Sequence, residues 1–279
     1  MSATSVSRAT MTTRVSTTTV TTTSTRLGMM LTDLRLPTIK RLAGDLCAQS
    51  DLEGWPAHRL LEALLEHEIN EREARRIDRH RSESGLSPDK RLSSFDFAAV
   101  PSVSKAQVMA LTEGTEWIDR GANVLLFGPP GVGKSHLVSA LGHALIDAGR
   151  RVLFTRCSDL VQRLQAARRD LRLPQELARL DRFDLLILDD LSYVRRDQAE
   201  TSVLFELISE RYERKSLAIT ANTPFSQWGE VFVEPAMTLA AVDRLVHHST
   251  ILEMNVESYR RRAAQAGHEP PARKTRSTT

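Results

Sequence analysis

The sequence predicts an α/β domain built on a five-stranded parallel sheet and preceded by a small all-helical domain. Five short apolar runs, at residues 124–127, 152–155, 185–188, 217–220 and 251–254, are separated by stretches with helical spacing. Strands that alternate with helices in this way form parallel sheets covered on both faces. Aromatic residues make up only 5% of the chain, which favours an α-rich α/β protein over an all-β one.

The chain of 279 residues has room for one α/β domain and a smaller accessory region. Its first 27 residues are dominated by Ser and Thr and contain no acidic residue, a composition that predicts disorder. The expected division is a disordered extension at 1–30, a helical domain at 31–81, a linker at 82–94, the α/β domain at 95–258 and a basic, disordered tail at 259–279.

Two other interpretations of the first residues stay open. A Ser- and Arg-rich start without acidic residues is also typical of an organelle transit peptide. The composition changes at Met29 and Met30, so translation could begin there instead.

The helical domain is expected to contain two helices separated by Trp55 and Pro56. Ile39, Leu42 and Leu46 share one helical face, and a second apolar face follows. The residues of that second face are Leu60, Leu61, Leu64, Leu65 and Ile69. Charges of both signs follow at spacings of three or four, so packing on neighbouring helices and contact with DNA are both open interpretations.

A glycine-rich loop joins the first apolar run of the α/β domain to a helical stretch. Residues 128–135 match the phosphate-binding pattern G-x-x-x-x-G-K-[ST]. Glycines let backbone N–H groups approach phosphate oxygens, and the start of the following helix favours the same anion. Lys134 is expected to reach the β- and γ-phosphates of ATP, and Ser135 to bind Mg²⁺. The predicted ATP-binding residues are Gly128, Pro129, Pro130, Gly131, Val132, Gly133, Lys134, Ser135 and His136.

Polar residues follow two other apolar runs of this domain. Asp189 and Asp190 come directly after 185–188, and Asn222 lies just beyond 217–220. Ligands bind at the carboxyl ends of parallel strands, so Asp189 is predicted to hold Mg²⁺ and Asp190 to orient or deprotonate the attacking water. Asn222 is predicted to hydrogen-bond the γ-phosphate or that water, although turn formation is the ordinary role of such residues.

Phe95 and Phe97 lie just upstream of the phosphate-binding loop. Chain in this position often covers the adenine, so either ring could stack on the base. Packing in the core is the alternative, and it is the commoner role of a phenylalanine.

Cysteine use and hydropathy exclude several classes of protein. Cys47 and Cys157 are far apart in the sequence, a spacing that indicates neither a disulfide scaffold nor a zinc site. No apolar run approaches the 18 or so residues that a membrane span needs. A cytoplasmic protein without a membrane partner is therefore expected.

Five segments together resemble the IstB family. They are the phosphate-binding loop and the segments at 186–193, 209–214, 220–232 and 243–248. Members of this family are AAA+ helper ATPases of insertion-sequence transposition, related to DnaC-type helicase loaders and DnaA initiators. The resemblance runs from Leu34 to Arg262, and the block Asn-Thr-Pro-Phe-Ser-Gln-Trp-Gly at 222–229 is its most discriminating part.

The resemblance implies an ATPase that forms an ATP-dependent homo-oligomer on duplex DNA and presents that DNA to a transposase. It also implies that Asn222 is the first sensor residue and that Arg244 reaches the γ-phosphate of a neighbouring subunit. A surface or DNA-contacting role is the alternative for Arg244. Asp190 stands where many AAA+ proteins have Glu, which predicts slow hydrolysis. Only 35 residues follow Arg244, so no second sensor arginine is assigned.

Arginines gather beyond the second apolar run. Residues 150–182 contain nine Arg and four acidic residues. Arg163, Arg168, Arg169 and Arg172 occupy the place where initiator-type AAA+ proteins carry an added helix that faces DNA. Contacts from Arg to phosphates give affinity without sequence preference and a steep salt dependence. The net charge of +3 is modest, so a solvated helix face is the other interpretation.

Three rival functions remain. A loader of a replicative helicase is the nearest, and it would use the helical domain to grip the helicase. A P-loop kinase would need a closing lid and an acceptor pocket, which the sequence does not indicate. A nucleotide-gated DNA scaffold that hardly hydrolyses ATP would differ only in turnover.

Overall fold

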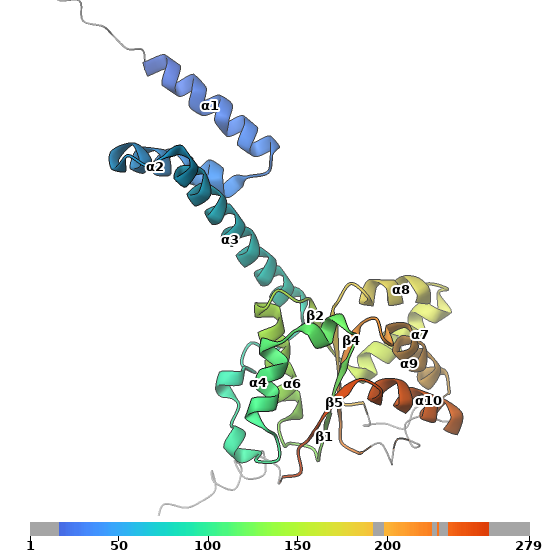
Figure 1. Ribbon diagram of the computed structural model, residues 1–279. Coiled ribbons are helices and arrows are strands. Elements are labelled where there is room, and N and C mark those ends of the chain that lie inside the picture. Colours follow the sequence, from blue (N-terminus) through green and yellow to red (C-terminus); the bar gives the residue numbers. More distant parts are fainter. Residues whose placement is uncertain (1–16, 192–197, 225–227, 229–233, 257–279) are drawn as a thin grey trace, which may run out of the picture. The chain divides into compact units, whose positions relative to one another are not determined.

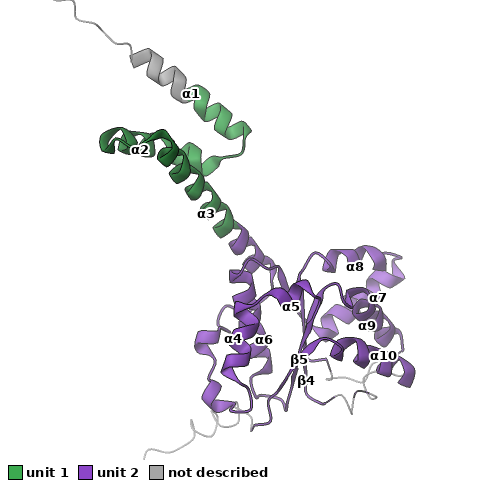
Figure 2. Cartoon of the chain, in the orientation of Figure 1, with its two compact units in different colours: residues 1–75 green, residues 76–279 purple. Residues whose placement is uncertain are grey.

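The computed structural model describes residues 17–191, 198–224, 228 and 234–256, with side chains from residue 25 onward. The chain divides into two compact units, residues 1–75 and 76–279 (Figure 2). This division falls inside helix α3 (Ala57–Glu83), whereas the sequence placed a boundary between residues 81 and 82. The unit that contains the phosphate-binding loop thus begins earlier than expected, with the last turns of α3.

The first unit begins with helix α1 (Thr17–Asp33), which is followed by α2 (Pro37–Glu53). The structure therefore differs from the disorder expected over residues 1–30, since residues 17–30 are helical. The C-terminal end of α1 is anchored on α2: Leu31 is buried, and the Lys40 amine donates to Thr32 Oγ1 at 2.8 Å. Residues 1–16, the rest of that expectation, lie outside the described part.

A buried carboxylate joins α2 to α3. Leu36 precedes α2 and offers no side-chain cap, and Glu68 of α3 takes that role by accepting from the backbone N–H groups of Thr38 and Ile39 at 2.8 and 3.0 Å. Arg72 Nε donates to the other Glu68 oxygen at 2.9 Å. Burial acts to raise the pKa of Glu68, but these hydrogen bonds outweigh it and lower the pKa.

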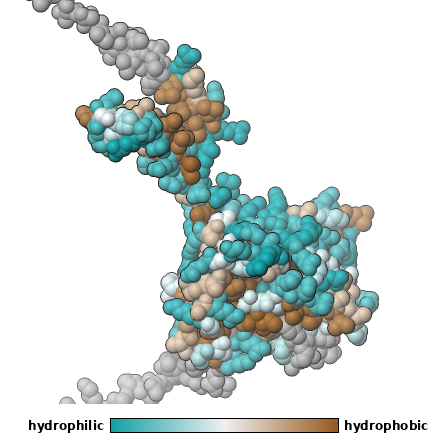
Figure 3. Space-filling model, viewed as in Figure 1, coloured by the Kyte–Doolittle hydropathy of each residue, from teal (hydrophilic) through white to brown (hydrophobic). Residues whose placement is uncertain are grey.

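The helices of this unit also expose apolar side chains. The sequence correctly placed the break between α2 and α3 near Trp55 and Pro56. Three residues of the second expected apolar face, Leu61, Leu65 and Ile69, nevertheless have exposed side chains. Figure 3 shows apolar residues gathered along the helices of this unit. The described part of the chain thus leaves these three side chains uncovered.

The second unit contains a sheet of five parallel strands, as the sequence predicted. The strand order is β2-β3-β4-β1-β5 (Figure 1). The strands are β1 (Asn123–Phe127), β2 (Val152–Arg156), β3 (Leu185–Asp189), β4 (Ser216–Ala221) and β5 (Ser249–Glu253). Because β1 and β4 are buried along their whole length, they form the centre of the core.

Helices cover both faces of this sheet (Figure 1). Side chains alternate along β1, so that Leu125 and Phe127 enter one apolar cluster and Val124 and Leu126 enter the other. The cluster around Val124 and Leu126, the second cluster, includes residues of α4 (Lys105–Glu113), α5 (Glu116–Asp119) and α6 (Lys134–Asp147). The 3₁₀ helices η1 (Leu92–Ser94) and η2 (Phe97–Ala99) pack beside it. The first cluster includes α7 (Cys157–Arg169), α8 (Leu173–Leu180), α9 (Gln198–Arg211) and α10 (Pro235–Val246).

The segment between η2 and β1 forms two helices, α4 and α5. Gly114 ends α4, and α5 begins two residues later. The indole N–H of Trp117 turns back and donates to the Leu111 carbonyl at 3.0 Å, which fixes the bend. Of the helices that the structure describes, none is both long and apolar enough to cross a membrane.

Candidate functional site

The phosphate-binding loop lies between the end of β1 and the start of α6. Gly128 has a φ of 149°, and a Cβ there would come within 2.4 Å of the Met254 carbonyl oxygen. Gly133 precedes α6 with a φ of 105°, in the region that favours glycine. Two glycines of the motif are therefore required by backbone geometry and packing, and the loop presents the N-terminus of a 14-residue helix to any anion it holds.

Lys134, the first residue of α6, is buried with its amine inside the loop. Its Nζ donates to the carbonyls of Gly128 and Pro129 at 2.6 and 2.9 Å, and to Asn222 Oδ1 at 2.8 Å. These contacts hold a positive charge between the loop and the end of β4. The sequence predicted that Lys134 and Asn222 share a site, and the structure brings them into direct contact.

Asp189, at the end of β3, contacts two hydroxyl groups. Ser135 Oγ donates to Asp189 Oδ1 at 2.8 Å, and Thr220 Oγ1 donates to the same oxygen at 2.7 Å. A carboxylate and a hydroxyl are the hard oxygen ligands that Mg²⁺ prefers. The two residues predicted to bind the metal are therefore adjacent, and their chemistry fits that ion.

Asp190 has an unusual backbone and a fixed carboxylate. Its φ is 67°, in the left-handed region, and its N–H donates to Thr220 Oγ1 at 2.9 Å. The Asn222 amide donates to Asp190 Oδ1 at 2.9 Å while its oxygen accepts from Lys134. Strained backbone of this kind clusters at functional sites, and here it brings Asp190 to the same cavity as the loop.

A cavity of about 480 Å³ opens over these groups, a volume within the range of small-molecule sites. Phe95 lines it and forms an edge contact with His136, with ring centroids 5.4 Å apart. Phe97 packs edge-on against Phe95 at 4.8 Å and does not line the cavity. Of the two rings, Phe95 is the one placed to meet a ligand. The lining residues are Lys90, Ser94, Phe95, Asp96, Ala99, Val100, Pro130, Gly131, Val132, Gly133, Lys134, Ser135, His136, Asp190, Thr220 and Asn222.

Arg244 does not line this cavity. It lies on α10, where its guanidinium stands over the ring of Phe205 at 4.9 Å and donates to the Ala240 carbonyl at 3.4 Å. The structure therefore separates Arg244 from the other predicted catalytic residues of its own chain.

The four arginines predicted to contact DNA differ in their surroundings. Arg163 and Arg168 form ion pairs with Glu176 and Glu206, respectively. Arg172 pairs with Asp170 at 2.5 Å but keeps 65% of its side chain exposed. Arg169, at the end of α7, is exposed and has no ion pair to any residue that the structure describes. The basic tail at 259–279, and residues 225–227 and 229 of the discriminating block at 222–229, lie outside the described residues.

Thr220 is the functional residue that sequence reasoning missed. It is buried, and its hydroxyl serves both Asp189 and Asp190. The feature that could have indicated Thr220 is its position near the end of β4, the strand that pairs with β3. A threonine at the end of an apolar run looks like an ordinary strand residue, which is why the pattern did not single it out.

A parallel sheet in this order, with the phosphate-binding loop after β1 and Asp189 and Asp190 at the end of β3, defines a P-loop nucleotide-binding fold. Among solved structures, the fold is similar to that of DnaA from Aquifex aeolicus bound to AMPPCP. The TM-score is 0.51 and the identity 18%, over 61% of this chain and 51% of that one. The chain belongs to the IstB-like ATP-binding protein family, whose model matches residues 29–267.

Individual relatives agree with this assignment. A Sinorhizobium fredii protein, whose name assigns it to an insertion sequence and to ATP binding, is 67% identical over 239 residues, or 86% of this chain and 80% of the relative. A Pseudomonas aeruginosa protein named for the insertion sequence IS21 and for ATP binding is 36% identical over 234 residues, covering 84% and 88% of the two chains. The family that the sequence motifs indicated is thus confirmed.

Proposed function

We propose that this protein is an ATP-hydrolysing helper of an insertion-sequence transposase, which assembles on duplex DNA with ATP and is released by hydrolysis. Nucleotide binding is supported by one observation: Lys134, Asn222 and Asp190 are joined by hydrogen bonds and line the same cavity. The relatives' names, which refer to insertion sequences and to ATP binding, support the biological part.

In this proposal, the phosphate-binding loop and Lys134 hold the β- and γ-phosphates of ATP. Ser135 and Asp189 hold Mg²⁺, which neutralises charge on the phosphates when it is bound. Asp190 orients the attacking water and accepts its proton, and Asn222 fixes the carboxylate that does so. Phe95 lines one side of the cavity and contacts the nucleoside of ATP.

Arg244 acts between subunits in this proposal. Because Arg244 does not line the cavity of its own chain, it is available to the site of a neighbouring copy. A guanidinium there stabilises charge that develops on the transferred phosphoryl group. An ATP-dependent homo-oligomer follows, because each site is then completed by the next subunit.

The contact with DNA is proposed to use arginine side chains and phosphates, so that binding depends little on sequence. Such binding suits a protein that offers many different target sites to a transposase. Arg169 and Arg172, the most exposed of the four predicted arginines, are the first candidates.

Capture of the transposase on DNA tests this function. The transposase of the same insertion sequence is mixed with immobilised duplex DNA, with or without this protein, ATP or ADP. We expect retention only with the protein and ATP together, and loss of retention with Lys134→Ala. Retention of the transposase that does not depend on this protein would contradict the proposal. The same assay is repeated with a replicative helicase and single-stranded DNA. ATP-dependent retention of the helicase, in place of the transposase, would indicate a helicase loader.

A further inference from the structure

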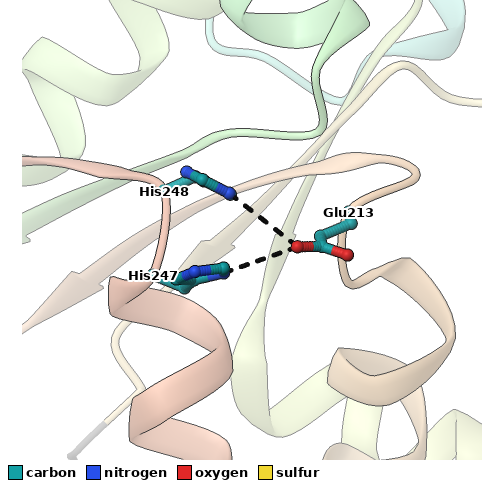
Figure 4. A group of neighbouring side chains, drawn as sticks. All are labelled: Glu213, His247 and His248. Atoms are coloured by element: carbon teal, nitrogen blue, oxygen red, sulfur yellow. Dashed lines mark ion pairs between the residues drawn. The ribbon is translucent and has the colours of Figure 1, made fainter.

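We propose that Glu213, His247 and His248 form a binding site for a divalent transition-metal ion of the zinc type. Figure 4 shows the three side chains converging from two separate segments. Glu213 lies in the turn between α9 and β4, and the two histidines lie between α10 and β5. None of them lines the nucleotide cavity, so this site is distinct from the one described above.

The spacing of the donor atoms fits a tetrahedral ion. His247 Nδ1 and His248 Nε2 lie 3.5 and 3.8 Å from the same oxygen, Glu213 Oε1. One ligand atom from each residue lies within 4.8 Å of the others. Donor atoms of a tetrahedral zinc ion with bonds of about 2.1 Å are about 3.4 Å apart. Small side-chain rotations would therefore bring the three donors to bonding distance.

The backbone of the Glu213 segment is held firmly in place. Glu213 has a φ of 56°, which is unusual for a residue other than glycine. The turn at Gly121 packs directly against it, since a Cβ on Gly121 would lie 2.8 Å from the carbonyl carbon of Glu213 and from Arg214 N. A larger residue at 121 would displace Glu213.

The same turn also holds the histidine segment. The backbone N–H of Asn123 donates to the His248 carbonyl at 2.7 Å, and its side-chain amide donates to the Leu245 carbonyl at 3.1 Å. Residues 121–123 thus position the backbone of both segments. Sites work best when rigid elements hold the ligating residues in this way.

The ligand chemistry favours zinc over Mg²⁺ or Ca²⁺, because imidazole nitrogen is a ligand of borderline-soft metals. The side chains are about half exposed, at 51% for Glu213, 50% for His247 and 55% for His248. An ion can therefore enter directly from solvent, and water can complete its coordination. The alternative is a set of exposed polar contacts without a metal, in which the Tyr212 hydroxyl lies 2.7 Å from His247 Nδ1.

A metal at this position would fasten the end of α10, which carries Arg244, to the turn before β4. Arg244 is three residues from His247 along the chain. The site would then restrict the helix whose arginine we propose to act in a neighbouring subunit. Metal binding itself does not depend on that proposal.

The test uses untagged, nucleotide-free full-length protein from which metals have been removed with a chelator. Calorimetric titration with Zn²⁺ should show one ion per chain, and Co²⁺ should give the visible absorption of a tetrahedral site without thiolate-to-metal charge transfer. Glu213→Gln and His248→Ala should each weaken zinc binding by about tenfold or more. Zinc should also raise the melting temperature of the wild type, because an ion that binds only the folded state stabilises it.

Two controls separate this site from other sources of binding. His58→Ala removes an exposed histidine of α3 and should leave zinc binding unchanged. Asp189→Asn alters the proposed Mg²⁺ ligand and should leave the zinc stoichiometry at one. The absence of saturable zinc binding to the wild type would overturn the proposal, as would undiminished binding to a protein with both histidines replaced.

Discussion

Thr220 Oγ1 donates a hydrogen bond to Asp189 Oδ1 at 2.7 Å. The same hydroxyl accepts from the backbone N–H of Asp190 at 2.9 Å. One buried hydroxyl at the end of β4 therefore sets the orientation of one carboxylate and the backbone of the next. The carboxylate pair is positioned by the neighbouring strand as well as by its own.

Replacement of Thr220 by Val should keep the shape of this side chain and remove both hydrogen bonds. We expect ATP turnover to fall by about 10- to 100-fold, and the Mg²⁺ concentration that gives half-maximal turnover to rise. Thr220→Ser restores the hydroxyl and should restore both quantities. Turnover measured against Mg²⁺ concentration checks this, and a Val variant with the Mg²⁺ dependence of the wild type would contradict it.

Replacement of Arg169 by Ala should weaken binding to duplex DNA equally for different sequences. It should also reduce the slope of log affinity against log salt by about 1, the effect of one phosphate contact. Arg163→Ala is the matched control on the same helix, because Arg163 already pairs with Glu176. Equal effects of the two substitutions would show that the ion pair does not decide which arginine meets DNA.

Two inactive variants should restore activity when they are mixed. Arg244→Ala should lower ATP turnover by about 10³-fold or more if this residue acts as an arginine finger. Asp190→Ala should abolish ATP turnover. In a mixed oligomer, an intact Asp190 site can face an intact Arg244 from the next subunit. Recovery of ATP hydrolysis against mixing ratio measures this, and no recovery at any ratio would count against a shared site.

Stability should fall as the solution becomes mildly acidic. His143 is buried on α6 with its Nε2 hydrogen-bonded to the Ser87 carbonyl at 2.9 Å, and burial lowers the pKa of its imidazole. Below about pH 6.5, the unfolded chain takes up a proton more readily than the folded one. The free energy of unfolding is therefore highest above that pH and declines below it.

His143→Gln should make this decline smaller. Urea unfolding between about pH 8 and 5 measures it. Part of the slope should remain, because burial also lowers the pKa of His80. A variant with the full pH dependence of the wild type would show that His143 is not the source.

Much of this fold could be predicted because its signals are local. Each strand is a short apolar run, and the glycine pattern at 128–135 requires a particular loop wherever it follows such a strand. The ends of parallel strands meet at one edge of the sheet, so Asp189, Asp190 and Asn222 could be assigned to one place before any contact was known.

The remaining features depend on contacts between distant parts of the chain. Thr220 matters because of what lies on the neighbouring strand, and Glu68 because it caps a helix 30 residues away. Arg163 belongs to a cluster of arginines that the sequence predicts to contact DNA, but in the structure it pairs with Glu176. The composition of the cluster does not reveal this ion pair. No periodicity or motif in the sequence encodes such pairings.

Binding to duplex DNA with ATP, with ADP and without nucleotide is the most direct test of the proposed function. We predict cooperative binding with ATP and Mg²⁺ that falls steeply with salt and is lost with ADP or in Lys134→Ala. Binding that is equally tight without nucleotide, or absent with ATP, would contradict an ATP-dependent assembly on DNA.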